Sequence, residues 1–174
     1  MKIGFISLTK TAHSSISQML PPINNFPNFS EDWLKFGKHQ CLKKSGQLED
    51  YEFLFTSVRH PVDRFLSSYK ECVRKYGYKK NINQFFEDYL DNKLSVMQLW
   101  HTQHQSFHII EDELDCIVKV ENFDSDMKKL CEFLGLPKSD SIWANKSRSK
   151  PNIDKSLRED IELCFKPCMD LFNY

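Results

Sequence analysis

Short apolar runs alternate along the chain with segments whose apolar residues recur at helical spacing. Runs of strand length, rich in β-branched or aromatic residues, occur at 2–8, 53–58 and 115–120. Helices are predicted at 14–20, from about Gln40, and at 61–76, 83–90, 125–134 and 155–172. Strands that alternate with helices form a parallel sheet covered on both faces. The pattern predicts a three-layer α/β fold, with a central parallel sheet flanked by helices.

Two stretches follow this alternation less regularly. A short strand or turn is expected at 33–36, and residues 94–110 form a polar segment with interspersed aromatic residues. Gly135 suits the end of the helix predicted at 125–134, because glycine adopts the left-handed conformation that often follows a helix, and Pro137 comes soon after.

Two polar segments follow directly after predicted strands. Residues 9–15 (T-K-T-A-H-S-S) come after the first strand, and Arg59 comes after the strand at 53–58. Ligands of open α/β sheets bind outside the carboxyl ends of the strands. Both segments are therefore candidate binding loops at one edge of the sheet. Together with the alternation of strands and helices, they predict a fold of P-loop NTPase type.

The segment from Arg59 to Tyr69 combines cationic and hydroxyl side chains with the start of a helix. Pro61 suits the first helical turn, where its missing N–H is not needed. Arg64 and Ser67 are spaced to lie close together on one helical face. Arginine side chains, a hydroxyl group and a helix N-terminus together suit a phosphate group. Arg64 packing inside the domain is the alternative to a ligand contact.

The loop at 9–15 offers a second set of anion-binding groups. Lys10 supplies a mobile positive charge, and hydroxyl groups stand at Thr11, Ser14 and Ser15. Hydroxyl oxygens cap helices or bind ligands, while the N–H groups of the turn face whatever lies above it.

Composition excludes several classes of protein. The chain has 24 Lys and Arg against 24 Asp and Glu, so no basic field points to nucleic acid as a partner. Its 174 residues predict one domain spanning 1–174, and the 13% aromatic content predicts a packed core. No apolar run approaches the roughly 18 residues of a membrane span. The six cysteines show no CxxC pair and suggest reduced core residues, not a zinc site.

These motifs resemble those of sulfotransferases that use 3′-phosphoadenosine-5′-phosphosulfate (PAPS). The pattern R-x-P-x-x-R-x-x-S-x-Y at 59–69 resembles the segment that binds the 3′-phosphate. The loop at 9–15 resembles the 5′-phosphosulfate loop P-K-T-x-G-[ST]-S, with Thr9 in place of the proline and His13 in place of the glycine. Weaker resemblances, some of them to the carbohydrate and heparan-sulfate branches, follow in order at 36–39, 116–123, 127–137, 145–148 and 170–174.

The resemblance implies transfer of a sulfuryl group from PAPS to a hydroxyl group, with a saccharide or glycan as the expected acceptor. It also implies release of the product adenosine 3′,5′-bisphosphate (PAP), and a cytoplasmic location, because PAPS is made in the cytosol. The implied cofactor-binding residues are Lys10, Thr11, Ala12, His13, Ser14, Ser15, Arg59, Ser67, Asn145, Ser147 and Arg148. No metal is required on this reading, because Lys10, Arg59 and helix N-termini supply the positive charge.

Two residues are expected to carry the catalysis. Lys10 would stabilise the charge on the leaving phosphate, and His39 would accept the proton of the acceptor hydroxyl. His101 and His104 are the next candidates for the base. Together with Gln105 they lie in a segment that in relatives is near the acceptor, and they are predicted to bind substrate.

Two other functions fit parts of the pattern. A P-loop kinase requires G-x-x-x-x-G-K-[ST], but this loop has no glycine and Lys10 precedes the hydroxyl groups. A non-catalytic nucleotide-binding relative is the second alternative, because the ring of His13 would crowd a cofactor at the usual glycine position. The basic residues that follow Tyr69 form either a solvated helix face or a rim for an anionic saccharide. Oligomeric state and acceptor identity stay open.

Overall fold

A computed structural model of the chain describes residues 2–20, 24–25, 38–136 and 151–174. The strands are β1 (Ile3–Ile6), β2 (Asn24–Asn25), β3 (Phe53–Val58) and β4 (Cys116–Lys119). The α-helices are α1 (His13–Met19), α3 (Lys38–Lys44), α4 (Pro61–Tyr76), α5 (Ile82–Leu90), α6 (Val96–Thr102), α7 (Phe123–Phe133), α8 (Lys155–Cys164) and α9 (Lys166–Leu171). Short 3₁₀ turns are η1 (Gln105–Phe107), η2 (Glu111–Glu113) and η3 (Val120–Asn122).

The chain divides into two compact units. The first unit comprises Met1–Arg59 and Gln105–Lys146, and the second comprises His60–His104 and Ser147–Tyr174. A single domain spanning 1–174 stays a prediction.

A parallel sheet forms the centre of the first unit. Its strand order is β2-β1-β3-β4, and every neighbouring pair is parallel. β3 lies in the middle, where Thr56 pairs with Ile6 of β1 and with Ile117 of β4. The side chains of β3 are buried along its whole length, which explains its continuous apolar run. The prediction of an α/β fold with a central parallel sheet is confirmed.

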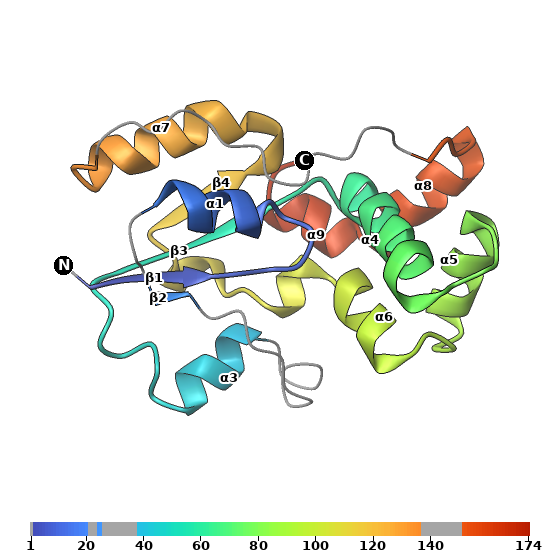
Figure 1. The fold of residues 1–174 in the computed structure, drawn as a ribbon, viewed down its shortest axis with the longest axis horizontal. Helices are drawn as coiled ribbons and strands as arrows, with labels where there is room; N and C mark the ends of the chain where they lie inside the picture. The colour runs from blue at the N-terminus through green and yellow to red at the C-terminus, as the bar shows by residue number, and fades with distance from the viewer. Residues whose placement is uncertain (1, 21–23, 26–37, 137–150) are drawn as a thin grey trace. The chain divides into compact units, whose positions relative to one another are not determined.

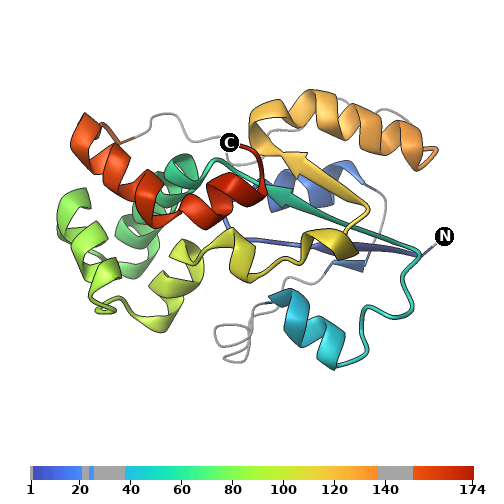
Figure 2. The same ribbon diagram turned by 180° about the vertical axis from the view of Figure 1, so that it is seen from behind.

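Alternate side chains of β3 contact helices on opposite faces of this sheet. Phe53 and Phe55 belong to a buried cluster that also contains Ile16 of α1 and Leu130 of α7. Leu54, between the two phenylalanines, packs in a separate cluster around α3. The first unit therefore has three layers, with α1 and α7 on one face and α3 on the other (Figures 1 and 2).

The second unit is helical and packs around aromatic side chains. Phe65 of α4 is buried, and its ring centroid lies 5.4 Å from that of Phe85 and 5.9 Å from that of Phe165. These rings come from α4, from α5 and from the residue between α8 and α9. A large aromatic core of this kind explains why Phe is so frequent in the sequence.

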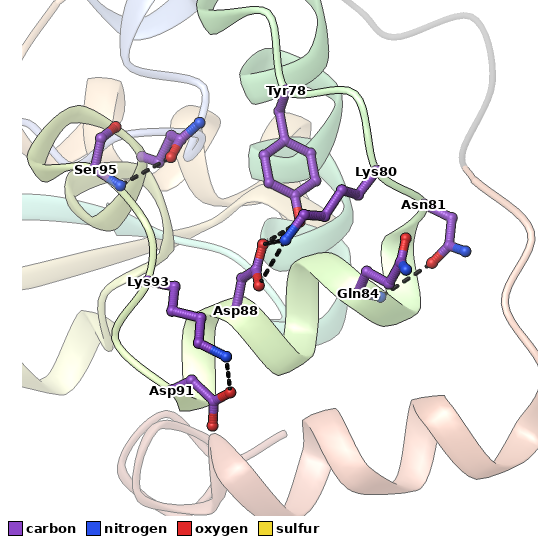
Figure 3. Close-up of polar contacts among 9 residues, drawn as sticks. Tyr78, Lys80, Asn81, Gln84, Asp88, Asp91, Lys93 and Ser95 are labelled. Atoms are coloured by element: carbon purple, nitrogen blue, oxygen red, sulfur yellow. Dashed lines mark hydrogen bonds and ion pairs between the residues drawn. The ribbon is translucent and has the colours of Figure 1, made fainter.

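A buried carboxylate of α5 holds the loop between α4 and α5 in place. Asp88 is 8% exposed, and its carboxylate accepts hydrogen bonds from the Tyr78 hydroxyl at 2.8 Å and from Lys80 Nζ at 2.7 Å (Figure 3). These bonds hold the pKa of Asp88 below its usual range. Burial, together with the bond to Asp88, raises the pKa of Tyr78. The network is satisfied internally and fixes the loop.

Most predicted elements agree with the structure to within a few residues. The strand at 53–58 and the helix at 61–76 match β3 and α4 at both ends. Gly135 has a φ of 65°, which confirms the left-handed residue expected after the helix at 125–134. The single helix predicted at 155–172 is wrong, because the chain forms α8 and α9 instead. Pro167, in the first turn of α9, cannot continue a helix from upstream.

Candidate functional site

The two candidate loops leave the same edge of the sheet in the first unit. β1 and β3 are parallel neighbours in register, with Ile3 opposite Phe53 and Ile6 opposite Thr56. The chain therefore passes from β1 into the loop at 7–12, and from β3 into Arg59, at the carboxyl ends of adjacent strands. The juxtaposition follows from strand order, as it does in other open α/β sheets.

The backbone of the first loop alternates in handedness. Lys10 has a φ of 64° and Ala12 a φ of 61°, whereas Thr11 between them is not left-handed. Such alternation turns successive N–H groups toward one point and forms an anion-binding concavity. Each left-handed non-glycine residue costs about 1–2 kcal/mol. Strain of this kind is typical of ligand-binding segments.

His13 does not occupy a left-handed position. The resemblance places His13 where relatives have glycine, a residue that readily adopts a positive φ. In the structure His13 is instead the first residue of α1, and the left-handed residue before the helix is Ala12. The side chain of Ser14 is half-buried, and its Oγ lies 3.2 Å from His13 Nε2.

Thr11 joins the first loop to β3. Its hydroxyl donates to the carbonyl oxygen of Leu8 at 2.9 Å and accepts from Ser57 Oγ at 3.0 Å. Thr11 and Ser57 are both fully buried, as is Ser15 of α1. The side chains of Thr11 and Ser15 are therefore shielded from a ligand, and in this conformation Thr11 can contact one only through its backbone. Sequence reasoning missed Ser57, which lies within an apolar strand.

Arg59 is held through its backbone and leaves its side chain available. Its N–H donates to Gln105 Oε1 at 2.9 Å, and its carbonyl accepts from Gln105 Nε2 at 2.7 Å. No partner of the Arg59 guanidinium occurs among the described residues, and the side chain is half-buried. Gln105 is 1% exposed, so the observed geometry favours a supporting role over direct contact with substrate.

Arg64 and Ser67 belong to the second unit. Arg64 is 2% exposed, and its Nη1 donates to the carbonyl oxygen of Gln103. Of the two roles that the sequence left open, packing within the fold is the one that the structure supports. Ser67 is half-buried on α4, and its contact with the cofactor stays a prediction.

His39 lies in α3 of the first unit with its ring fully buried. Its Nε2 is 3.5 Å from Oε2 of Glu113, and Lys43 contacts the same carboxylate. Neither ring nitrogen has a hydrogen-bond partner within the described ranges. Burial lowers the pKa of His39, the Glu113 carboxylate opposes this by raising it, and Lys43 adds to the lowering. The ring is thus held toward its neutral form.

The two alternative histidines make contacts inside the second unit. Nε2 of His101 lies 3.1 Å from the Tyr76 hydroxyl, and the carbonyl of His101 accepts from Ser68 Oγ at 2.6 Å. The ring of His104 stacks on Phe165 with centroids 4.4 Å apart. Burial, followed by the charge of Arg64, lowers the pKa of His104. A role for either histidine at an acceptor stays a prediction.

Several predicted positions lie outside the described residues. These are the expected strand or turn at 33–36 and the cofactor-binding candidates Asn145, Ser147 and Arg148. Within the described ranges, no group of three or more His, Cys, Asp or Glu side chains could hold a metal ion. Among the helices that the structure describes, none is both long enough and apolar enough to cross a membrane.

Comparison with known proteins identifies the family. The sequence pattern of the sulfotransferase family matches residues 2–174. No curated protein matches the chain. A crystal structure of a sulfotransferase from Alicyclobacillus acidocaldarius is similar, with a TM-score of 0.59 and 14% identity over 98% of this chain and 95% of that one. At this identity the likeness establishes the fold, which is P-loop NTPase-like. By its family match over nearly its whole length, the chain belongs to the sulfotransferase family.

Proposed function

We propose that this sulfotransferase uses PAPS as donor and a hydroxyl group of a saccharide or glycan as acceptor. The observation that carries the proposal is the pairing of two anion-binding features at one edge of the first unit's sheet. These are the left-handed turn at Lys10 and Ala12, after β1, and the Arg59 side chain, after β3. Two separate points of positive potential suit a nucleotide with phosphate groups at both its 5′ and 3′ positions.

The residues of the first unit fit such a nucleotide chemically. The N–H groups of the turn and the half-buried Lys10 would hold its 5′ end. The Arg59 guanidinium, which none of the described residues engages, would hold the 3′-phosphate in a forked geometry that lysine could not reproduce. Ala12, at the end of the loop, and His13 and Ser14, in the first turn of α1, would complete the proposed 5′ site.

PAPS, when bound, supplies the sulfuryl group. The task of the protein is then to position both reactants and to stabilise charge, as in phosphoryl transfer. Lys10 would place a positive charge beside the 5′-phosphate, where negative charge would develop as the sulfuryl group is transferred. Removing one preorganised donor of this kind costs about 10²–10³-fold in rate.

His39 is the proposed base for the acceptor hydroxyl. Its lowered pKa keeps the imidazole neutral and able to accept a proton. Nε2 faces Glu113, which leaves Nδ1 as the nitrogen for the acceptor. Because the ring is fully buried here, this role requires that the ring become accessible when the acceptor binds.

Titration calorimetry with PAP and with ATP–Mg²⁺ tests the nucleotide class. We expect PAP to bind and ATP–Mg²⁺ to bind far more weakly; the reverse order would indicate a kinase-like protein. Transfer of labelled sulfate from PAPS to a panel of saccharides then tests activity. Binding of PAP without transfer to any hydroxyl acceptor would indicate a non-catalytic relative.

A further inference from the structure

The side chain of Gln105 pairs with both backbone groups of Arg59. Oε1 accepts from the Arg59 N–H at 2.9 Å, and Nε2 donates to the Arg59 carbonyl at 2.7 Å. Gln105 is 1% exposed, so these bonds form away from water, where an unpaired polar group is costly. All of these atoms belong to the first unit.

This pairing extends the backbone hydrogen bonding of β3 one residue beyond the last paired residue of the strand. Val58 is the final residue of β3 and pairs with Lys119 of β4. Arg59 follows it, and the amide of Gln105 supplies the donor and the acceptor that a neighbouring strand would otherwise provide. The N–H and the carbonyl of Arg59 are therefore both hydrogen-bonded, as in a strand residue, although Arg59 stands in a loop.

Gln105 is itself anchored. It begins η1, and its carbonyl accepts from the N–H of His108 at 2.9 Å. The carbonyl of His108 accepts in turn from the N–H of His39 at 3.1 Å. The amide of Gln105 is thus presented by a fixed backbone, and a side chain lacking either its donor or its acceptor would leave one buried group of Arg59 unpaired.

We propose that Gln105 is a positioning residue that aims the Arg59 guanidinium and so determines selectivity for nucleotides with a 3′-phosphate. The inference rests on the proposed function, in which Arg59 binds that phosphate. It assigns Gln105 a role through Arg59, in place of the direct substrate contact that the sequence suggested. Glutamate at this position would accept from the Arg59 N–H but would set a carboxylate oxygen against the Arg59 carbonyl.

The test compares binding of PAP with binding of adenosine 5′-monophosphate (AMP), which lacks the 3′-phosphate. Calorimetry measures both affinities in wild type, Gln105→Glu, Arg59→Ala and the double variant, with Gln47→Glu as the control. Gln47 is exposed in the first unit, so its substitution makes the same chemical change away from Arg59.

We expect the preference of wild type for PAP over AMP to fall about tenfold in Gln105→Glu, the scale of a lost buried hydrogen bond. AMP affinity should change less than threefold, and Gln47→Glu should behave like wild type. In the Arg59→Ala background, Gln105→Glu should reduce the preference no further, because the two residues act through one contact.

Two results would overturn the inference, and they differ in what else they reject. Folded Gln105→Glu protein that keeps the wild-type PAP preference rejects the positioning role alone. Wild type that does not bind PAP rejects the proposed function and the inference with it. If circular dichroism shows that Gln105→Glu is unfolded, Gln105→Met, of similar length and without the carboxylate, takes its place with the same expectations.

Discussion

In the first unit, Nε2 of His39 lies 3.5 Å from Oε2 of Glu113, and the imidazole is fully buried. Burial and two charged neighbours act on the charge of this ring, and their effects oppose one another. Burial and the nearby Lys43 favour the neutral imidazole, whereas the Glu113 carboxylate favours the imidazolium. Burial has the largest effect, so the pKa of His39 lies below its usual value of 6.5.

We expect substitutions of the two charged neighbours to move the pKa of His39 in opposite directions. Glu113→Gln should lower it further, because the stabilising carboxylate is lost. Lys43→Met should raise it, because a repelling cation is removed. Proton NMR titration of the histidine ring signals measures both. If the pKa of His39 moved in the same direction in both variants, the opposing effects assigned to Glu113 and Lys43 would be wrong.

The same lowered pKa makes stability depend on pH. In the unfolded chain His39 binds a proton near pH 6.5, whereas in the fold it does so only at lower pH. The unfolded state thus binds more protons, so the free energy of unfolding falls as the pH drops below about 6.5. Urea unfolding at pH 8 and pH 5.5 should show a smaller difference for His39→Gln than for wild type.

The substitution His39→Ala should show whether His39 acts as the base or as a residue that binds the nucleotide. If His39 accepts the acceptor proton, the substitution should lower kcat by about 10²–10⁴-fold with PAP affinity nearly unchanged. The acid limb of the wild-type kcat/KM profile should also disappear. Near wild-type turnover with an intact acid limb would transfer the role to His101 or His104.

Lys10→Ala should differ from His39→Ala in one measurable respect. In the proposed site, Lys10 would contact the nucleotide before the reaction as well as during it. Its loss should therefore weaken PAP binding and also lower kcat by about 10²-fold. Lys2→Ala, at an exposed residue of the first unit, is the control. Loss of turnover with PAP affinity unchanged would place Lys10 away from the bound nucleotide.

Arg59 and Arg64 should respond to alanine substitution in different ways. Arg59→Ala should weaken PAP binding by about 2–3 kcal/mol, the scale for a charged hydrogen-bonding partner, with little change in thermal stability. Arg64→Ala should lower the melting temperature instead, because the buried guanidinium bonds the Gln103 carbonyl. Calorimetry and thermal unfolding on both variants distinguish the roles. Unchanged PAP affinity in Arg59→Ala would remove the main support for the proposed 3′ site.

Asp88→Asn should destabilise the second unit. The carboxylate accepts bonds from both Tyr78 and Lys80, and its pKa is held low by them (Figure 3). We expect a drop in melting temperature of roughly 5 °C. Asp91→Asn is the matched control, because Asp91 pairs with Lys93 at the surface. Equal effects of the two substitutions would show that burial of Asp88 adds nothing.

Local pattern predicted the elements well where one signal dominated. β3 is a continuous apolar run ended by Arg59, and α4 begins at the proline that suits a first turn. The apolar pattern does not predict the break between α8 and α9, because the helical spacing of apolar residues continues through Pro167. The spacing of apolar residues does not show that proline lacks the backbone N–H that a continuous helix needs.

The partners of polar side chains could not be predicted in the same way. Gln105 bonds a residue 46 positions earlier, and Ser57 bonds Thr11, also 46 positions away. The tertiary fold brings such groups together, and the spacing of residues in the sequence does not reveal it. For Arg64, the sequence predicted the position on α4 correctly but left its role open. The burial of the guanidinium and its bond to a carbonyl oxygen decide that role, and the spacing along the helix does not.

The hydroxyl contact between Thr11 and Ser57 has a consequence for how the site can change. It cross-links the loop after β1 to β3 itself, and backbone hydrogen bonds already set the spacing of these two strands at about 4.8 Å. The distance between the proposed 5′ and 3′ anion sites is therefore set by the spacing of the strands and not by the side chains of the loops. Side-chain substitutions can strengthen or weaken either end, but nucleotides with a different distance between phosphates would require a different sheet.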